Sequence, residues 1–355
     1  MAPHIPSIAA TLSSLSAGSI LAIVAVLTLV RYNCRRTDGA GAQTLAEYAE
    51  LGIVGAVLVW MLIRPFALQA YFIPSPSMEP TLFGEDGSGD RILVNKFTYR
   101  VGKPGRDNVV VFVPPYIAAA GDQGITNDNG VPVDENGIPV NFIKRLIGLP
   151  GDTLEAHAGV IFVDSRPYDH DDIRKECGAA HLLGDDWANL KDLQSEYHVK
   201  FLPGGVEING SPKLVTPTQI ATMITGNPAS VVKIIPGYTV RNGQRLNEPF
   251  TAEDPDYNLK IYNGQPLKNL DPYKYQYKYD GPGEFTLGDQ PIAEETYDRD
   301  NLSPTGEIPA GQYFMMGDNR NDSKDSTVWG PLDAAGVIGR AQFIFWPLNR
   351  AGAIR

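Results

Sequence analysis

Two apolar runs near the N-terminus constrain the fold of this chain more than any other feature. The first run, from Ser7 to Val30, contains no charged residue. It is long enough to cross a hydrocarbon core of about 30 Å as a helix. The second run extends from Leu51 to Ile63 and stops at Arg64. We therefore expect two transmembrane helices, one over 1–30 with a short N-terminus and one over 46–64.

Each run has an alternative interpretation. A cleaved signal peptide would carry its positive charges before the apolar run, whereas Arg31, Arg35 and Arg36 follow it,. The second run alone is short for a membrane span, so a buried core helix is the alternative there. The three arginines place the link 31–45 in the cytoplasm by the positive-inside rule. Residues 65–355 then lie on the exported side.

The exported part is expected to be a β-dominated globular domain. The chain is 43% hydrophobic and contains 28 prolines and 36 glycines, which is typical of a loop-rich body,. The stretch 116–140 is interpreted as an exposed loop or insertion because it is rich in Gly, Asp and Asn,. Short runs of β-branched and aromatic residues bounded by turn formers predict strands at 90–96, 108–114, 140–148, 311–316 and 336–347,.

Charge and cysteine content exclude several function classes. A formal net charge of −11 speaks against a nucleic-acid partner, which requires a basic face,. Only Cys34 and Cys177 are present, and the predicted topology places them on opposite sides of a bilayer, so we expect no disulfide,. The five histidines have no recognisable metal-binding spacing. We therefore expect neither a metal nor another cofactor.

Two serines stand one residue apart in a proline-rich segment just beyond the second apolar run. Pro74, Pro76 and Pro80 frame Ser75 and Ser77, and proline restricts its own backbone and that of the preceding residue,. A serine held on a stiff backbone suits nucleophilic catalysis because its orientation is fixed before the substrate arrives. The alternative is a polar turn at the end of a strand.

A lysine lies in the middle of the short apolar strand predicted at 140–148. Strand alternation places Lys144 on the same face as Phe142 and Leu146,. Burial beside such residues favours the neutral amine and lowers the pKa of a lysine. A neutral Lys144 could act as a general base, and an ordinary surface lysine is the alternative.

The order of three motifs resembles bacterial type I signal peptidase (leader peptidase). These motifs are the segment 74–82, Lys144-Arg145 before Gly148-Leu-Pro-Gly-Asp152, and the segment 317–326. The resemblance implies a membrane-docked, largely antiparallel β catalytic domain with serine–lysine dyad chemistry, in which the stretches around 116–140 and 165–235 are insertions. It implies a multi-pass protein of the cell (inner) membrane, with the catalytic domain on the periplasmic face. Signal-peptide-bearing preproteins would be its substrates, the lipid bilayer a partner, and the protein-export machinery a further candidate partner.

The resemblance also assigns roles at the dyad. Ser77 is the implied nucleophile and Lys144 the implied general base. The Ser77 backbone N–H and the Ser75 hydroxyl would form the oxyanion hole. Ser323 would hydrogen-bond the Lys144 amine and hold it against Ser77.

Further positions match the supporting and substrate-binding parts of the family. Arg145 and Asp325 would form a supporting ion pair. The residues that match the walls of the small substrate pockets, which accept small side chains before the cut, are Ile73, Pro74, Phe142 and Ile143.

The chain departs from the family pattern at several positions. Pro76 stands where glycine is common, and Asn321-Asp322 reverses the usual order of the two residues. Thr327 occupies a position that is often arginine, and Lys324 replaces a small residue near the floor of the substrate site. Two other functions therefore stay open: a specialised serine–lysine maturation peptidase of a conjugation-type system, and a catalytically inactive, membrane-anchored assembly factor.

Overall fold

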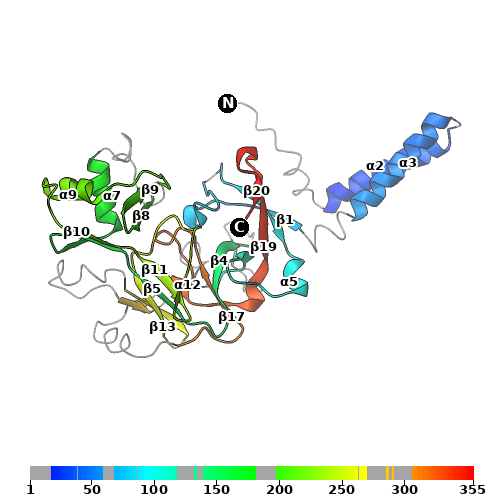
Figure 1. Ribbon diagram of the computed structural model, residues 1–355. Helices are drawn as coiled ribbons and strands as arrows, with labels where there is room; N and C mark the ends of the chain where they lie inside the picture. The colour runs from blue at the N-terminus through cyan, green and yellow to red at the C-terminus, as the bar shows by residue number, and fades with distance from the viewer. Residues whose placement is uncertain are drawn as a thin grey trace. The chain divides into compact units, whose positions relative to one another are not determined.

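The structure is a computed structural model with two compact units (Figure 1). The smaller unit comprises residues up to 72 together with 91–103 and 339–353, and the larger unit comprises 73–90, 104–338 and 354–355. The residues that the structure describes are 17–37, 39–58, 68–85, 87–116, 118, 132–133, 139–180, 197–262, 264–269, 285–287, 290–291 and 306–355.

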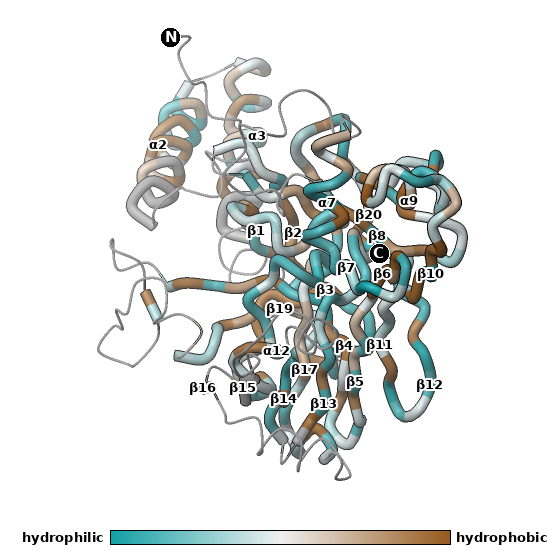
Figure 2. Tube along the Cα trace, turned by 90° about the vertical axis from the view of Figure 1, so that its left-hand side faces the viewer, coloured by the Kyte–Doolittle hydropathy of each residue, from teal (hydrophilic) through white to brown (hydrophobic). Residues whose placement is uncertain are grey.

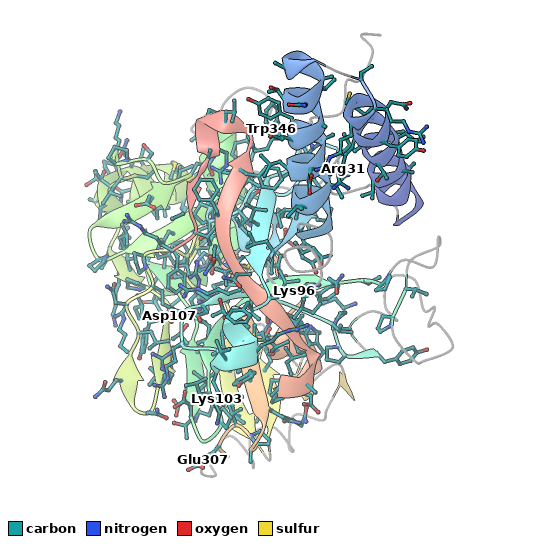
Figure 3. All side chains as sticks on the ribbon, turned by 90° about the vertical axis from the view of Figure 1, so that its right-hand side faces the viewer. Arg31, Lys96, Lys103, Asp107, Glu307 and Trp346 are labelled. Atoms are coloured by element: carbon teal, nitrogen blue, oxygen red, sulfur yellow. The ribbon has the colours of Figure 1, made fainter. Side chains whose placement is uncertain are left out.

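The smaller unit contains a helical hairpin made of α2 (Ala17–Arg35) and α3 (Ala40–Leu58), which lie side by side in Figures 1 and 2. One carboxylate joins the two helices, because Glu50 on α3 accepts from Arg31 Nε at 3.1 Å and from Arg35 Nη2 at 2.9 Å. Figure 3 labels Arg31 on α2. Helix α2 continues past Val30, so the predicted link 31–45 is largely helical.

The predicted membrane spans extend beyond the described helices. Residues 1–16 of the first span and 59–64 of the second lie outside the described residues. Within the described part of the chain, no helix combines the length and the apolar character that crossing a bilayer requires. Both spans stay predictions.

The smaller unit also contains an antiparallel sheet in the order β1-β2-β19-β20. A short helix, α5 (Thr98–Val101), follows β2. Several large apolar side chains on this sheet are exposed, among them Phe72, Phe343 and Trp346, the last of which is labelled in Figure 3. The strands are β1 (Leu68–Phe72), β2 (Arg91–Asn95), β19 (Val337–Trp346) and β20 (Gly352–Ala353).

In the larger unit, one antiparallel sheet carries the predicted lysine strand. Its order is β3-β4-β17-β18, and Lys144 on β4 pairs with Val110 on β3. The predicted strands at 108–114, 140–148 and 311–316 are confirmed here. The strands are β3 (Val109–Phe112), β4 (Phe142–Gly148), β17 (Gln312–Met316) and β18 (Leu332–Asp333).

A second sheet of the larger unit has the order β12-β11-β5-β13-β14-β15-β16. Its core includes Leu154, Leu259 and Phe314. All strand pairs described for this sheet are antiparallel, so the prediction of a mainly antiparallel β fold is confirmed. The strands are β5 (Leu154–His157), β11 (Tyr238–Arg241), β12 (Gln244–Arg245), β13 (Asn258–Tyr262), β14 (Gln265–Asn269), β15 (Phe285–Leu287) and β16 (Gln290–Pro291).

The segment 165–235 builds an apolar core together with β6. Three strands form the sheet β10-β6-β7, and β8 and β9 form a separate hairpin. Ile173, Cys177, Phe201 and Ile220 meet in the buried cluster. The elements are β6 (Val160–Val163), β7 (Arg166–Tyr168), α7 (His170–Ala179), β8 (Val199–Leu202), β9 (Gly205–Ile208), α9 (Pro217–Thr225) and β10 (Val232–Ile235). Most of the other predicted insertion, 116–140, lies outside the described residues.

Candidate active site

The predicted nucleophile lies on a short 3-10 turn, η2 (Pro76–Met78), that follows the extended residue Ser75. Two glycines let the following loop pack against this segment. A Cβ at Gly84 would lie 1.7 Å from the carbonyl oxygen of Ser75, and one at Gly89 would lie 1.9 Å from that of Ile73. No side chain fits at either position, so the pair of glycines fixes the backbone that presents Ser77.

Lys144 and Ser77 meet, as the sequence predicts. The Lys144 Nζ donates to the Ser77 Oγ at 2.6 Å, and the two residues are only 5% and 7% exposed. Burial lowers the pKa of Lys144 to about 8, although Asp325, Asp318 and Asp322 favour the charged amine,. The expected burial is confirmed, although alternation is not its cause, because Lys144 and all following residues of β4 are buried on both faces.

Ser75 also lies at the dyad. Its Oγ is 3.3 Å from the Ser77 Oγ, and Ser75 is an exposed residue. The Ser77 hydroxyl is thus placed between an amine and a second hydroxyl. This arrangement can remove a proton from Ser77 on one side and offer a hydrogen-bond donor on the other.

The supporting ion pair differs from the expected one. Arg145 binds Asp318 and not Asp325, with Nε–Oδ1 and Nη2–Oδ2 distances of 2.7 and 2.6 Å. Thr81 joins the same pair by donating to the Asp318 Oδ2 at 2.5 Å. Both charged side chains are almost completely buried, and the bidentate geometry satisfies both carboxylate oxygens,. The pair connects β4, which carries Lys144, to the loop after β17.

Asp325 binds backbone N–H groups instead of Arg145. Its carboxylate accepts from the backbone N–H of Gly317 at 2.7 Å and from that of Thr327 at 2.9 Å. It therefore caps α12 (Ser326–Trp329) and closes the loop 317–325 on itself,. Its charge still acts on Lys144, whose pKa it raises against the effect of burial.

Ser323 lies close to Ser77, but it does not form the expected hydrogen bond to the Lys144 amine. A Cβ at Gly317 would approach both the Ser323 Oγ, at 2.3 Å, and the Ser77 carbonyl oxygen, at 2.4 Å, so Gly317 separates the two serines. Among the described residues, the buried Ser323 Oγ has no hydrogen-bond partner. The expected hydrogen bond between Ser323 and Lys144 is therefore absent from this structure.

The four predicted pocket residues lie on the two segments that carry the dyad. Ile73 is buried and Pro74 exposed just before the nucleophile turn, whereas Phe142 and Ile143 are half-buried on β4. The Phe142 ring centre lies 5.8 Å from the Lys144 Nζ. The structure thus brings Phe142 to the dyad, and it does not test what these residues bind.

A buried polar network that the sequence reasoning missed supports the loop 317–325. The Asn321 Nδ2 donates to Glu253 Oε2 at 2.9 Å and to the Asp254 carbonyl at 3.1 Å. Glu253 also accepts from Arg174 Nη2 and from the Val199 N–H, each at 2.7 Å. The adjacent acidic residues Glu253-Asp254 between two strands were the available signal. The network ties the segment 165–235 to the loop beside the dyad.

No metal site accompanies this chemistry in the described part of the chain, where no cluster of three or more His, Cys, Asp or Glu has ligand geometry. The described groups can perform proton transfer between a serine and a buried amine, which is the chemistry of an activated nucleophile. A mainly antiparallel β scaffold that holds a buried amine against a serine is an arrangement suited to a serine hydrolase.

Comparison with known proteins identifies the family. The family model described as "Signal peptidase, peptidase S26" matches residues 45–207 and 223–346. "Probable signal peptidase I-2" of Synechocystis sp. is 32% identical over 326 residues, covering 92% of this chain and 84% of that protein. "Probable signal peptidase I-1" of the same organism is 24% identical over 88% of each chain. "Signal peptidase I" of Mycobacterium tuberculosis is 35% identical over 36% of this chain and 47% of its own length. The chain belongs to the signal peptidase family, peptidase S26.

Proposed function

We propose that this enzyme removes N-terminal signal peptides from exported preproteins, with Ser77 as nucleophile and Lys144 as general base. The observation that carries the proposal is the 2.6 Å contact between the buried Lys144 amine and the Ser77 hydroxyl, in a member of the signal peptidase family. A neutral Lys144 takes the Ser77 proton while Oγ attacks the scissile carbonyl. The resulting ammonium then gives the proton to the leaving amine, and water hydrolyses the acyl-enzyme.

The oxyanion that develops in this step needs donors. The Ser77 N–H and the Ser75 hydroxyl are the proposed donors, supported by the position of Ser75 Oγ 3.3 Å from Ser77 Oγ,. Ile73, Pro74, Phe142 and Ile143 are the proposed walls for the small side chains before the cut. Ser323 acts only through packing around Gly317 in this mechanism. No step requires a cofactor.

A cleavage assay tests the proposed function. Detergent-solubilised enzyme is incubated with a secretory preprotein whose signal peptide ends in Ala-x-Ala, and the N-terminus of the product is sequenced. We expect a single cut after the second alanine, and no product from Ser77→Ala. Cleavage by Ser77→Ala at the parent rate would contradict the nucleophile assignment. A profile restricted to one precursor would favour the specialised maturation peptidase, and no cleavage of any precursor by the folded parent would favour the inactive assembly factor.

We further propose that the enzyme is anchored in the inner membrane by spans over 1–30 and 46–64, with 65–355 on the periplasmic face. The apolar sequences of the two runs and the arginines between them support this topology,. Exposed apolar side chains on the sheet of the smaller unit, including Phe343 and Trp346, suit a lipid interface,. The lipid bilayer and, through its substrates, the export machinery are the proposed partners.

Thiol labelling of intact cells tests this topology. Cys34 is partly exposed, whereas Cys177 is completely buried and burial raises its thiol pKa to about 12. A membrane-impermeant maleimide should therefore leave Cys177 unmodified in the folded protein. We expect Cys34 to react only after the membrane is permeabilised. Modification of Cys34 in intact cells would contradict a cytoplasmic link, and Cys34→Ser gives the background signal.

A further inference from the structure

An open groove of about 880 Å³ begins beside the nucleophile turn. Pro74, Pro76 and Glu79, from the segment around the nucleophile, line it together with His198, Lys200, Leu202 and Glu207 at the hairpin β8–β9. Pro249, Thr251 and Ala252 line it as well. The segment 165–235, whose role the sequence leaves open, therefore supplies part of the lining of a groove that reaches the neighbours of Ser77.

The hairpin wall is fixed to the nucleophile turn. The His198 Nε2 lies 3.3 Å from the Glu79 Oε2, two residues after the nucleophile. The Lys200 Nζ donates to the carbonyl oxygen and to the hydroxyl of Thr251, at 2.9 and 3.1 Å. The groove is thus held by contacts on two sides and is a preformed surface.

The position of the groove indicates which part of a substrate it meets. Of the four residues proposed as walls for the side chains before the cut, only Pro74 also lines the groove, whereas Ile73, Phe142 and Ile143 do not. The groove leaves Ser77 by Pro76 and Glu79 instead. An extended polypeptide that crosses Ser77 from β4 would continue into the groove with the residues that follow the cleaved bond.

The groove carries more negative than positive groups. Its carboxylates are Glu79, Glu85 and Glu207, and Lys200 is its lysine. Glu79 faces His198, and Glu85 accepts from Ser88. Glu207 stands opposite Lys200 in the hairpin register, but the Lys200 Nζ donates to Thr251, and among the described residues Glu207 has no ion pair within 4.0 Å. Its carboxylate can therefore receive a cation from a ligand.

We propose that this groove binds the segment of the substrate that follows the cleaved bond, and that Glu207 makes it favour a basic over an acidic side chain there. The inference rests on the proposed function and adds a specificity that belongs to the segment 165–235. One partly exposed ion pair changes affinity by about three- to fivefold, and replacing attraction by repulsion increases the effect.

A peptide series tests the proposal. Each peptide carries the same Ala-x-Ala site, followed by an alanine-rich segment with one lysine or one glutamate at the second to the sixth position after the cut. The parent enzyme should cleave the lysine peptide with a kcat/KM about five times that of the glutamate peptide at one or two adjacent positions. Glu207→Lys should reverse this ratio, and the rate of each enzyme on the all-alanine peptide serves as its own reference.

A matched control separates a local contact from general charge. Glu176→Lys makes the same charge change on α7, in the same segment but outside the groove, and should leave the ratio unchanged. A ratio near one at every position, or one that Glu207→Lys leaves unaltered, would overturn the groove assignment while the proposed function stands. If Glu176→Lys changed the ratio as much as Glu207→Lys, the specific contact would be excluded. Failure to cleave the all-alanine peptide would overturn both.

Discussion

Lys144→Arg should abolish cleavage as completely as Ser77→Ala does, with kcat reduced by at least about a thousandfold. Arginine keeps the length and positive charge of lysine, but its guanidinium stays protonated at every working pH. The general base would therefore be lost while the hydrogen bond to Ser77 could still form. Initial rates on a secretory preprotein, measured beside the parent enzyme, provide the comparison.

The pH dependence of cleavage by the parent enzyme should follow the titration of Lys144. The pKa of Lys144 is lowered to about 8, so the neutral, active amine gains population as pH rises through that value,. Well below it, kcat/KM should increase about tenfold per pH unit. Bound substrate excludes water and disfavours the ammonium further, so the rising limb of kcat should lie at lower pH than that of kcat/KM.

Two further variants keep this prediction independent of folding. Lys144→Met fills a similar volume without a charge. It should be folded, because Lys144 forms no hydrogen-bonded ion pair with any described residue that the change would break, and it should be inactive, because the base is gone. Lys213→Arg on the exposed surface should retain the parent rate. Appreciable cleavage by folded Lys144→Arg or Lys144→Met would show that the base lies elsewhere, and a flat profile between pH 6 and 9 would contradict the lysine titration.

The residues alone left a polar turn and a surface lysine open, and the order of the three motifs was needed to pair Ser77 with Lys144, which lie 67 positions apart. The prolines around Ser77 indicated a restricted turn, which is found, whereas β4 is buried on both faces from Lys144 onward and shows no alternation there. The predicted partner of Arg145 was wrong, because the spacing of residues in the sequence does not distinguish between Asp318 and Asp325 in one loop. The register does: Met316 pairs with Arg145, so Asp318, two residues further, lies near the guanidinium. Asp325 reaches the α12 N-terminus instead.

Helix α7 was missed for a related reason. No helix was predicted over 170–179, yet Asp169 caps α7 and Asp172 completes the capping box,. Ile173 and Cys177 at helical spacing were the signal that these charges begin a helix with a buried face,. The adjacent acidic residues Glu253-Asp254 were a signal of a polar site, but Asn321 lies far away in the chain and no periodicity or motif connects it to them.

The contact between Asn321 and Glu253 explains the reversed Asn321-Asp322 order. It also leads to the prediction that Asn321→Asp destabilises the protein. Glu253 is 1% exposed, and its Oε2 receives the Asn321 Nδ2 at 2.9 Å. Asn321→Asp would place a carboxylate oxygen against this carboxylate, with no donor between them. We expect the free energy of unfolding to fall by about 3 kcal/mol, the size of a broken buried charge network. Cleavage should fall as well, because the loop 317–325 would be displaced beside the dyad.

Glu253→Gln distinguishes this repulsion from a general intolerance at Asn321. In the Asn321→Asp background, the new amide could donate to the introduced carboxylate while its oxygen still accepts from Arg174 and the Val199 N–H,. The double variant should therefore be more stable than Asn321→Asp alone, although Glu253→Gln by itself destabilises by weakening its bond to Arg174. Urea unfolding of the four proteins gives the coupling energy, and Asn227→Asp on the exposed surface is the charge control. Additive effects of the two changes would mean that the Asn321–Glu253 contact does not hold the loop, and the reversed order would need another cause.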